Sequence, residues 1–414
     1  MFWILAMAFV IGFAMAFSIG ANDVANSMAP SVGAKALTLK QAVLIAGVLE
    51  FAGAYVFGRS VVETIRKGIV NIDLITDPNV LLAGAFAALI ASVIFVVIST
   101  AFSMPVSTSH AIVGAMAGFG VVAVGAHAVC WVRLFWISIA WVLSPVLGAL
   151  LAFGFFKLFV WTVLHNDRPA NAVVIAGPIS AGVTVLVLGV MFCMEVLHCR
   201  DLTVPLLLSV PLAAITGLLT WHVIRRRWRR AFGAGAEDAG AEKHFSFVEG
   251  VYRRLQLGTA CYVSLAHGSN DVANAIGPIA AIYVVAQTGL VSGNVEFPRW
   301  LLAFGGVGIA LGAWIWGHRV MQTIGHNITE ITNTRGFTIS FSTATTVLLA
   351  SVLGMPVSTT HTVVGAVVGV GFARGLEAVN LSVVRQIVLS WFLTVPAAAA
   401  TSAIVYLVIR PYFH

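Results

Sequence analysis

The stretch GANDVAN, residues 20–26, returns as GSNDVAN at residues 268–274. Five letters, NDVAN, are identical in the two copies although the copies lie far apart in the chain. Both stand in strongly apolar surroundings, where an aspartate and two asparagines cost free energy unless they have partners. Asp23 and Asp271 therefore belong to a repeated polar cluster that needs a structural or chemical reason.

The composition of the chain is that of a membrane protein. Of the 414 residues, 59% are hydrophobic and 9% are charged, whereas soluble domains carry about 25% charged residues. Apolar runs fill nearly the whole length, which predicts an all-α polytopic membrane protein. The four cysteines lie in or near these runs without metal-ligand spacing, so we expect them to be packing residues.

Hydropathy divides the chain into about twelve transmembrane segments. We expect them at residues 2–19, 39–58, 80–102, 108–127, 132–164, 172–193, 203–223, 257–286, 300–318, 337–354, 360–373 and 385–409. The segments at 108–127 and 360–373 are rich in glycine, and the second is short. We expect broken helices or the arms of helical hairpins at these two places.

The two halves of the chain repeat one another. GANDVANSMAP (20–30) matches its later copy at seven of eleven positions, and GAYVFGRSVVETI (53–65) matches GAWIWGHRVMQTI (312–324) at six of thirteen. MPVSTSHAIVGAMAGFG (104–120) matches MPVSTTHTVVGAVVGVG (355–371) at eleven of seventeen. The order is kept throughout, so the repeat covers about five segments in each half.

This repeat predicts four regions and an inverted arrangement. We expect an N-terminal repeat at 1–165, two linking transmembrane segments at 166–224, a loop at 225–256 and a C-terminal repeat at 257–414. With five crossings in each repeat and two between, equivalent segments are seven crossings apart, and the second repeat is upside down. Inverted repeats are typical of transporters, which bind their substrates near the bilayer midplane.

A basic run sets the expected orientation. RRRWRR at 225–230 stands beside an apolar segment, and basic residues in this place mark the cytoplasmic side of a membrane. The AFGAGAEDAGAEKHFSF that follows is small and polar, which predicts a flexible linker rather than a nucleic-acid site. With the central loop in the cytoplasm, both termini lie outside. Arg59, Arg66 and Lys67 then also lie outside, which counts against this topology.

The paired aspartates predict a cation site. A carboxylate at bilayer depth costs at least about 2.5–3.5 kcal/mol, and neither cluster contains a lysine or an arginine. The partner is then a metal cation or a proton, unless each aspartate only caps a broken helix. Carboxylate, amide and carbonyl oxygens suit small cations such as Na⁺. Gly20 and Pro30 allow the first helix to break and expose carbonyls. The side chains concerned are those of Asp23, Asp271, Asn22, Asn26, Asn270 and Asn274.

The two MPVST stretches predict an anion site. A proline at the first helical position followed by Ser and Thr is a helix start, and a helix start within a membrane offers free N–H groups and a partial positive charge. Two such starts meeting from inverted units would form a donor cage suited to a tetrahedral oxyanion, although hydroxyl groups can also simply hold helices together. The hydroxyl groups are those of Ser107, Thr108, Ser109, Ser358, Thr359 and Thr360.

Three further polar residues are candidates for coupling. His110 and His361 follow the two Ser/Thr runs at matched positions. Each is either a hydrogen-bonded structural residue or a proton carrier. Glu50 has Ile309 as its repeat counterpart, so any role for it is one-sided. His267 stands before the second cluster only, where the first has Ile19, and we place it outside the symmetric core.

The carboxylates and the donor cage together predict symport. An oxyanion beside Asp23 and Asp271 is repelled strongly at low dielectric, and no arginine offsets the repulsion. Binding becomes favourable only when cations or protons neutralise the aspartates. Anion and cation then bind together, which is the physical basis of a cation-coupled anion carrier.

At these residues the sequence resembles the inorganic phosphate transporter (PiT) family, which carries a duplicated signature of the GANDVAN…P and PVSTTH kind. The resemblance covers essentially the whole chain. It implies Na⁺- or H⁺-coupled phosphate uptake, an inverted-repeat helical fold with hairpins meeting at the site, and a homodimer. By match, phosphate ligands fall on the two Ser/Thr runs, to which we add Asn22 and Asn270, and the Na⁺ ligands are Asp23, Asn26, Asp271 and Asn274.

The resemblance also bears on the coupling ion and the location. GANDVAN is more similar to Na⁺-coupled members than to the H⁺-coupled bacterial branch, whose cluster reads more like GFHDTAN, so Na⁺ is the expected ion and H⁺ the alternative. Glu50 lies where animal members carry a functional glutamate, but its partner in the second half is replaced at Ser340. The short central loop indicates a prokaryotic cell membrane.

Other functions predict different behaviour. Symport of another oxyanion, above all sulfate, would show as competition by sulfate in uptake. A passive channel would conduct without regard to the Na⁺ gradient. A membrane-embedded enzyme lacks support, because the sequence has no pairing of nucleophile and base and no metal-ligand spacing beyond the coupling ion.

Overall fold

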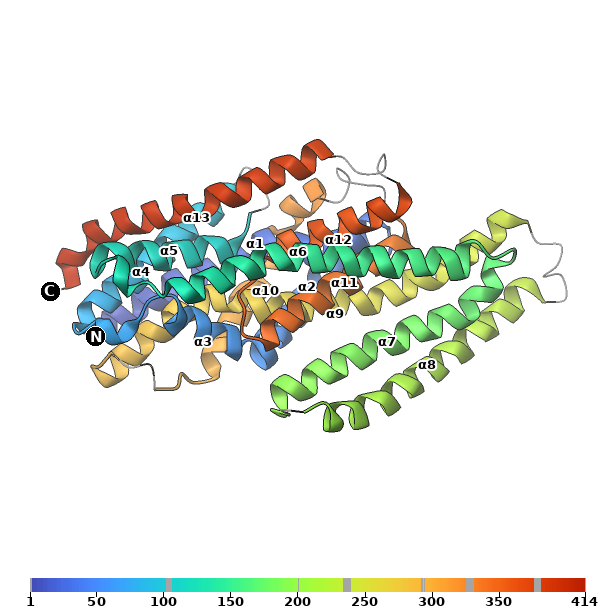
Figure 1. The fold of residues 1–414 in the computed structure, drawn as a ribbon, viewed down its shortest axis with the longest axis horizontal. Coiled ribbons are helices and arrows are strands. Elements are labelled where there is room, and N and C mark those ends of the chain that lie inside the picture. Colours follow the sequence, from blue (N-terminus) through green and yellow to red (C-terminus); the bar gives the residue numbers. More distant parts are fainter. Residues whose placement is uncertain are drawn as a thin grey trace.

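The computed structural model describes residues 2–101, 106–199, 201–233, 240–291, 293, 295–324, 331–375 and 381–413, without the side chains of 318–324, 381–384 and 386–391. The described residues form an all-helical bundle (Figure 1). Its α-helices are α1 (Phe2–Gly33), α2 (Leu39–Phe57), α3 (Arg59–Gly68), α4 (Pro78–Ala101), α5 (Thr108–Ala123), α6 (Trp131–Phe159), α7 (Pro169–Val196), α8 (Thr203–Phe232), α9 (Ala241–Thr288), α10 (Trp300–Ile324), α11 (Asn333–Val352), α12 (Thr359–Arg374) and α13 (Leu381–Ile409).

Eight of the described helices are long and apolar enough to cross a membrane: α1, α2, α4, α6, α7, α8, α10 and α13. The all-α polytopic fold class is therefore confirmed, whereas twelve crossings stay a prediction. The other four predicted segments fall on α5, α9, α11 and α12. At 16 residues each, α5 and α12 are about 24 Å long, shorter than a bilayer core of about 30 Å.

The two halves interlock. Helix α1 packs on α10 and α9 packs on α2, so each signature helix lies against a helix of the other half. In the same way α5 packs on α13, and α12 packs on α6. Glycines make these contacts close, because a Cβ on Gly114 or Gly118 would meet the backbone of α13, and one on Gly365 would meet that of α6. These glycines therefore serve close helix packing.

Helices α1 and α9 run in opposite directions alongside each other. Gly12, early in α1, packs on Ile279, late in α9, whereas Gln256, early in α9, donates to the backbone oxygen of Pro30, late in α1. Their two NDVAN clusters face each other between these contacts. The C-terminal end of α8 and the start of α9 lie at one end of the molecule, and both chain termini lie at the other (Figure 1).

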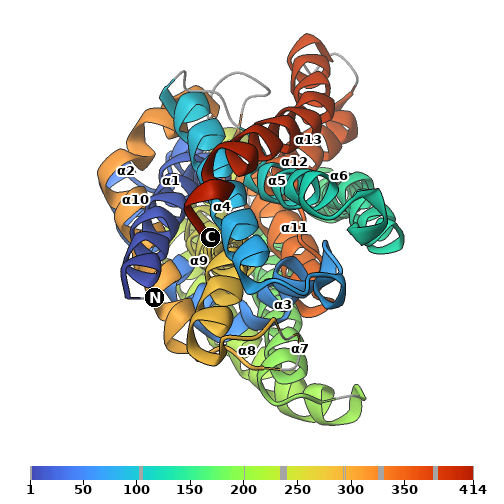
Figure 2. The same cartoon turned by 90° about the vertical axis from the view of Figure 1, so that its left-hand side faces the viewer.

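Helices α7 and α8 form a hairpin at the edge of the bundle, with α13 at the opposite edge (Figure 2). The sequence predicted a flexible linker over the residues after 230. This prediction is wrong for 241–247, which begin α9, and the basic run at 225–230 is itself helical. Phe232 stacks on His244 with ring centroids 5.0 Å apart, and Lys243 lies over the Phe232 ring. These contacts tie the two helix ends together.

Neither signature helix breaks. The sequence predicted a break between Gly20 and Pro30, but α1 is continuous over both residues, and α9 is continuous over Gly268 and Pro278. Both glycines lie at close helix contacts: a Cβ on Gly20 would lie 1.9 Å from the Ile309 oxygen, and one on Gly268 2.0 Å from the Glu50 oxygen. The glycines therefore serve packing rather than a break.

Candidate functional site

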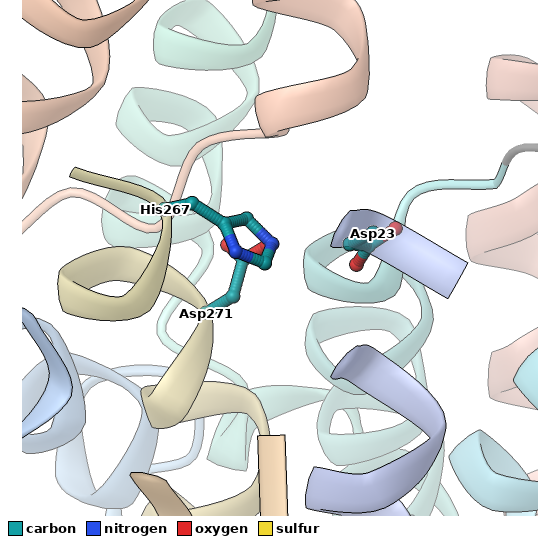
Figure 3. A group of neighbouring side chains, drawn as sticks. All are labelled: Asp23, His267 and Asp271. Carbon is teal, nitrogen blue, oxygen red and sulfur yellow. The ribbon is translucent and has the colours of Figure 1, made fainter. Parts of the chain in front are cut away.

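The two aspartates meet in the middle of the bundle. Asp23 on α1 and Asp271 on α9 are each 1% exposed. Ligand atoms of Asp23, Asp271 and His267 all lie within 4.8 Å of one another. Figure 3 shows Asp23 facing His267 and Asp271 across the gap between the two helices. The two NDVAN clusters are thus parts of one site.

Each aspartate accepts a hydrogen bond from the start of a short helix in its own half. Thr108, the first residue of α5, donates to Asp23 Oδ2 at 2.9 Å, and Thr359, the first residue of α12, donates to Asp271 Oδ2 at 3.1 Å. All four side chains are buried. Carboxylate and helix start therefore form matched pairs, as the predicted anion and cation sides of one cavity require.

The asparagines that end the two clusters cross to the other half. Asn26 donates to Thr360 Oγ1 at 2.7 Å, and Asn274 donates to Thr108 and Ser109, each at 3.1 Å. Hence every Ser/Thr run touches both signature helices.

The two runs also contact each other directly. Ser109 donates to the Val357 oxygen at 2.9 Å, and Thr360 donates to the Val106 oxygen at 3.3 Å. The starts of α5 and α12 therefore converge at the carboxylates, as the sequence predicted.

Helix caps organise the two starts. Ser107 and Ser358 are the N-cap residues, and their side chains accept hydrogen bonds from the backbone N–H groups of His110 and His361. The sequence placed proline at the first helical position. This is wrong for Pro356, which precedes α12 by three residues, while Met104 and Pro105 lie outside the described residues. Ser107 and Ser358 use only their oxygens in capping, so their hydroxyl hydrogens can be donated to an anion. Thr108, Ser109, Thr359 and Thr360 already donate their hydrogens to other groups.

A family model described as the phosphate transporter family matches residues 19–402 of this chain. This chain belongs to the phosphate transporter family. A solved structure titled "The sodium-dependent phosphate transporter" is 49% identical, superposes with a TM-score of 0.89, and covers 99% of each chain.

Curated relatives agree with this assignment. The protein of Pyrococcus abyssi named "Putative phosphate permease" is 49% identical over 405 residues, which are 98% of this chain and 97% of that protein. The "Inorganic phosphate transporter 2-1, chloroplastic" of Arabidopsis thaliana is 41% identical over 419 residues, covering 96% of this chain and 70% of that protein. The family is one of transporters, so the prediction that the chain is not an enzyme is confirmed.

His267 is the residue of this transporter that sequence reasoning missed. Its Nδ1 lies 2.9 Å from Glu50 Oε1 and its Nε2 lies 2.9 Å from Asp271 Oδ2. Ser27 also donates to Glu50 Oε1, at 3.1 Å. The sequence placed His267 outside the symmetric core because its repeat counterpart is Ile19. The spacing of His267 and Asp271, four residues apart on one helix face, was the available signal.

The contact between Glu50 and His267, which we call the Glu50–His267 bridge, adds a third carboxylate to the site. Glu50, Asp23 and Asp271 bring three carboxylates together, and the imidazole of His267 can offset at most one negative charge. Two negative charges then remain, so neutralising the site takes at least two monovalent cations or protons. The repeat counterparts of Glu50, His267 and Ser27 are Ile309, Ile19 and Ala275, so this bridge exists on one side only.

His110 and His361 pair with each other. Their ring centroids are 4.5 Å apart, and His110 also packs on Trp141 at 3.9 Å. Trp141 in turn donates to the backbone oxygen of Pro356, just before α12. The two histidines thus form an edge-to-face pair in the first turns of α5 and α12, where they support these helix starts.

Asn22 and Asn270 brace the chain before each short helix. Asn22 donates to Thr100, and Asn270 donates to Ser351 and to the Met355 oxygen. Their side-chain oxygens accept from the backbone N–H groups of Val106 and Val357. The predicted phosphate contact of these amides stays a prediction, and their visible work is to hold the two helix starts in place.

The donor atoms fit Na⁺. In the part of the chain that the structure describes, Asp271 Oδ1 and Asn274 Oδ1 are buried and accept no hydrogen bond. Pro30 and Pro278 lack N–H groups, so the carbonyls of Asn26 and Asn274 lose their usual donors four residues later. Proline thus frees backbone oxygens inside a continuous helix, where the sequence had predicted a break. Carboxylate, amide and carbonyl oxygens are the ligands that such a cation prefers.

Proposed function

We propose that this protein is a symporter that imports inorganic phosphate and is driven by Na⁺. The observation that carries the proposal is the pair of hydrogen bonds from Thr108 to Asp23 and from Thr359 to Asp271. A hydroxyl group has a single hydrogen to donate. While Thr108 donates to Asp23, it cannot donate to a phosphate oxygen.

Cation binding resolves this competition. A Na⁺ held by Asp23 and Asp271 takes over the carboxylate lone pairs, and the threonine hydroxyl groups are then free to turn to phosphate. The same cation removes the repulsion between phosphate and the carboxylates, which is severe in a buried site. Both effects make anion binding depend on prior cation binding, and this dependence couples the two fluxes.

Phosphate would lie at the starts of α5 and α12. First-turn N–H groups and the hydroxyls of Ser107 and Ser358 offer donors to a tetrahedral anion, and each helix start adds a partial positive charge. The relative named a phosphate permease favours phosphate, and the sodium-dependent structural neighbour favours Na⁺.

Protons are the second candidate for the coupling ion. His267 lies between two carboxylates and can carry a proton beside the cation site. A sulfate carrier is a further alternative. Phosphate retains acidic hydrogens that can be donated to Asp23 or Asp271, whereas sulfate at neutral pH has none.

The test is uptake of labelled phosphate into proteoliposomes with Na⁺ and proton gradients imposed separately. We expect an inward Na⁺ gradient to drive accumulation, an equal K⁺ gradient to fail, and sulfate in excess to compete weakly. If a pH gradient drives accumulation in Na⁺-free buffer, the coupling ion is H⁺ and not Na⁺. Equilibration that ignores both gradients would indicate a channel.

The membrane arrangement is part of the proposal. The antiparallel course of α1 and α9 supports inverted repeats, and the basic end of α8 supports a cytoplasmic α8–α9 connection with both termini outside. The basic residues that count against this topology are partly neutralised, because Arg59 pairs with Glu296, and Arg66 and Lys67 pair with Glu63. Labelling of a cysteine placed at residue 240 in sealed cells tests the orientation.

A homodimer in the cell membrane completes the proposal and rests on the family resemblance. Native mass spectrometry of the detergent-solubilised protein tests it. We expect a species of twice the chain mass that persists on dilution.

A further inference from the structure

Several buried side-chain oxygens outside the carboxylate site accept no hydrogen bond among the described residues, and five of them belong to one set on α1, α9 and α11. They are Ser31, Gln256, Ser264, Ser340 and Thr343, and each is at most 1% exposed. Among the described residues, their side-chain oxygens find no hydrogen-bond partner. A buried oxygen left unpaired costs about 1–3 kcal/mol, so five of them in one region indicate water or a passing ion.

The five side chains connect the site to one end of the molecule. On α9, Gln256, Ser264, His267 and Asp271 follow one another at helical spacing and share a face. Gln256 donates to the Pro30 oxygen of α1, and a Cβ on Gly336 of α11 would meet the Gln256 amide. Helices α1, α9 and α11 therefore meet at Gln256, on the side of the site towards the α8–α9 connection.

Helix α11 follows the same route. Gly336, Ser340, Thr343 and Ser351 lie on one face by their spacing. That face begins at Gln256 and ends at the site, because Ser351 contacts both Ser269 and Asn270. Ser340 and Thr343 thus lie between these two levels. We call Ser31, Gln256, Ser264, Ser340 and Thr343 the hydroxyl path.

The other half of the molecule has no such path. By the sequence repeat, the counterparts of Gln256, Ser264, Ser31 and Ser340 are Ala8, Ala16, Ile279 and Leu89, all at most 1% exposed. Only Thr343 has a polar counterpart, Ser92. Ile279 also fills the space beside Gly12, so this region is closed by apolar contacts. In this conformation the matching region therefore offers no polar route to the site.

We infer that the hydroxyl path is a hydrated passage for the coupling cation between the carboxylate site and the α8–α9 end of the molecule, and that the matching region of the first half is a dry seal. The inference deepens the proposed symport and rests on it for the identity of the ion. Hydroxyl and amide oxygens offer a Na⁺-sized cation weak ligands in sequence, which permits passage without trapping.

Cysteine accessibility tests the passage directly. In a variant with the four native cysteines replaced by alanine, Ser264→Cys and Ser340→Cys are compared with their matched controls, Ala16→Cys and Leu89→Cys. A thiol reacts with a charged methanethiosulfonate reagent only where water reaches it as thiolate, so we expect the first pair to react at least about tenfold faster. Added Na⁺ should slow the reaction of Ser264→Cys and Ser340→Cys with the reagent, because the cation occupies the passage. Equal rates in the two pairs would overturn the inference.

A transport measurement separates passage from packing. Thr343→Val keeps the shape and removes the hydroxyl group. We expect phosphate uptake to slow severalfold while phosphate affinity, measured by calorimetry, stays unchanged. Normal uptake with a higher unfolding temperature would mean a dry core and overturn the passage. The accessibility readout needs no transport, so a failure of Na⁺-driven uptake alone would count against the proposed function and not against the hydrated passage.

Discussion

Thr108 donates its hydroxyl hydrogen to Asp23 over 2.9 Å, and this bond joins the anion side of the site to the cation side. Its oxygen accepts from Asn274 of the other half. One hydroxyl group thus senses the carboxylate of its own repeat and the amide of the opposite repeat. Coupling between two ions needs such a shared group, because a ligand shifts an equilibrium only through contacts that differ between the two states.

Loss of either aspartate charge should uncouple the transporter. We expect Asp23→Asn and Asp271→Asn each to abolish Na⁺-driven phosphate uptake, because an amide cannot neutralise and hold a cation as a carboxylate does. The protein should still elute as a folded species in gel filtration. Asp73→Asn, an exposed carboxylate, is the control. Near-normal uptake in both site variants would show that Asp23 and Asp271 do not form the cation site.

The threonines at the two helix starts should set phosphate affinity. A hydrogen bond to a charged partner contributes about 1.5–3 kcal/mol, so Thr108→Val and Thr359→Val should each weaken apparent phosphate affinity roughly ten- to a hundredfold. Thr401→Val is a matched control, because Thr401 is partly exposed, lies far from the site in sequence and donates within its own helix. If the site variants change only the expression level, the hydroxyl groups hold helices together and do not bind the anion.

The Glu50–His267 bridge should behave as a coupled pair in stability. Removing one partner of a buried ion pair typically costs about 3–5 kcal/mol, while replacing both by apolar residues is often neutral. The symmetry-related contact between α1 and α10 already holds Ile19 and Ile309 at these two positions. We therefore expect Glu50→Ile or His267→Ile alone to lower the unfolding temperature, and the double variant to recover most of it.

Transport should respond differently from stability in this cycle. The double variant should be folded but should lose phosphate uptake, because a carboxylate beside the cation site is gone. If the double variant instead loses as much stability as the two single variants together, Glu50 and His267 do not interact.

Close helix contacts at Gly20 and Gly268 should tolerate no side chain. A Cβ at either position would lie within 2.0 Å of a backbone oxygen of α10 or α2, and backbone cannot move aside as a side chain can. We expect Gly20→Ala and Gly268→Ala to give little folded protein. Gly258→Ala on α9 meets nothing within 4 Å and should express normally. Normal yields for the first two variants would contradict the interlocked packing.

Much of the site could be predicted because it repeats. The two aspartates and the two Ser/Thr runs stood at matched positions of the two repeats. Because the repeats interlock, these matched positions come together at one site. His267 escaped prediction because it breaks the repeat, so the same symmetry that identified the aspartates directed attention away from it. Its contact with Glu50 joins residues far apart in the chain and depends on how α2 packs on α9, which hydropathy does not determine.

The predicted break in α1 was wrong for a different physical reason. Gly20 and Pro30 are helix breakers in isolation, yet α1 continues through both. Within a packed bundle, the backbone has few alternative partners, and the glycine gains a close helix contact that no other residue allows. The proline costs one intrahelical hydrogen bond and frees the carbonyl of Asn26. Local propensity was overridden by packing at the place where the site needs a free oxygen.

The interlocking of the halves also governs how the protein is made. Helix α1 leaves the ribosome long before its partner α10, and at about 5–20 residues per second the delay is roughly 15–50 s. Asp23 must enter the membrane and wait through that interval, with Thr108 of its own half arriving early and Asp271 and His267 arriving late. A nascent first half is thus an unfinished product with a buried carboxylate. The insertion machinery must shelter it until the second half emerges.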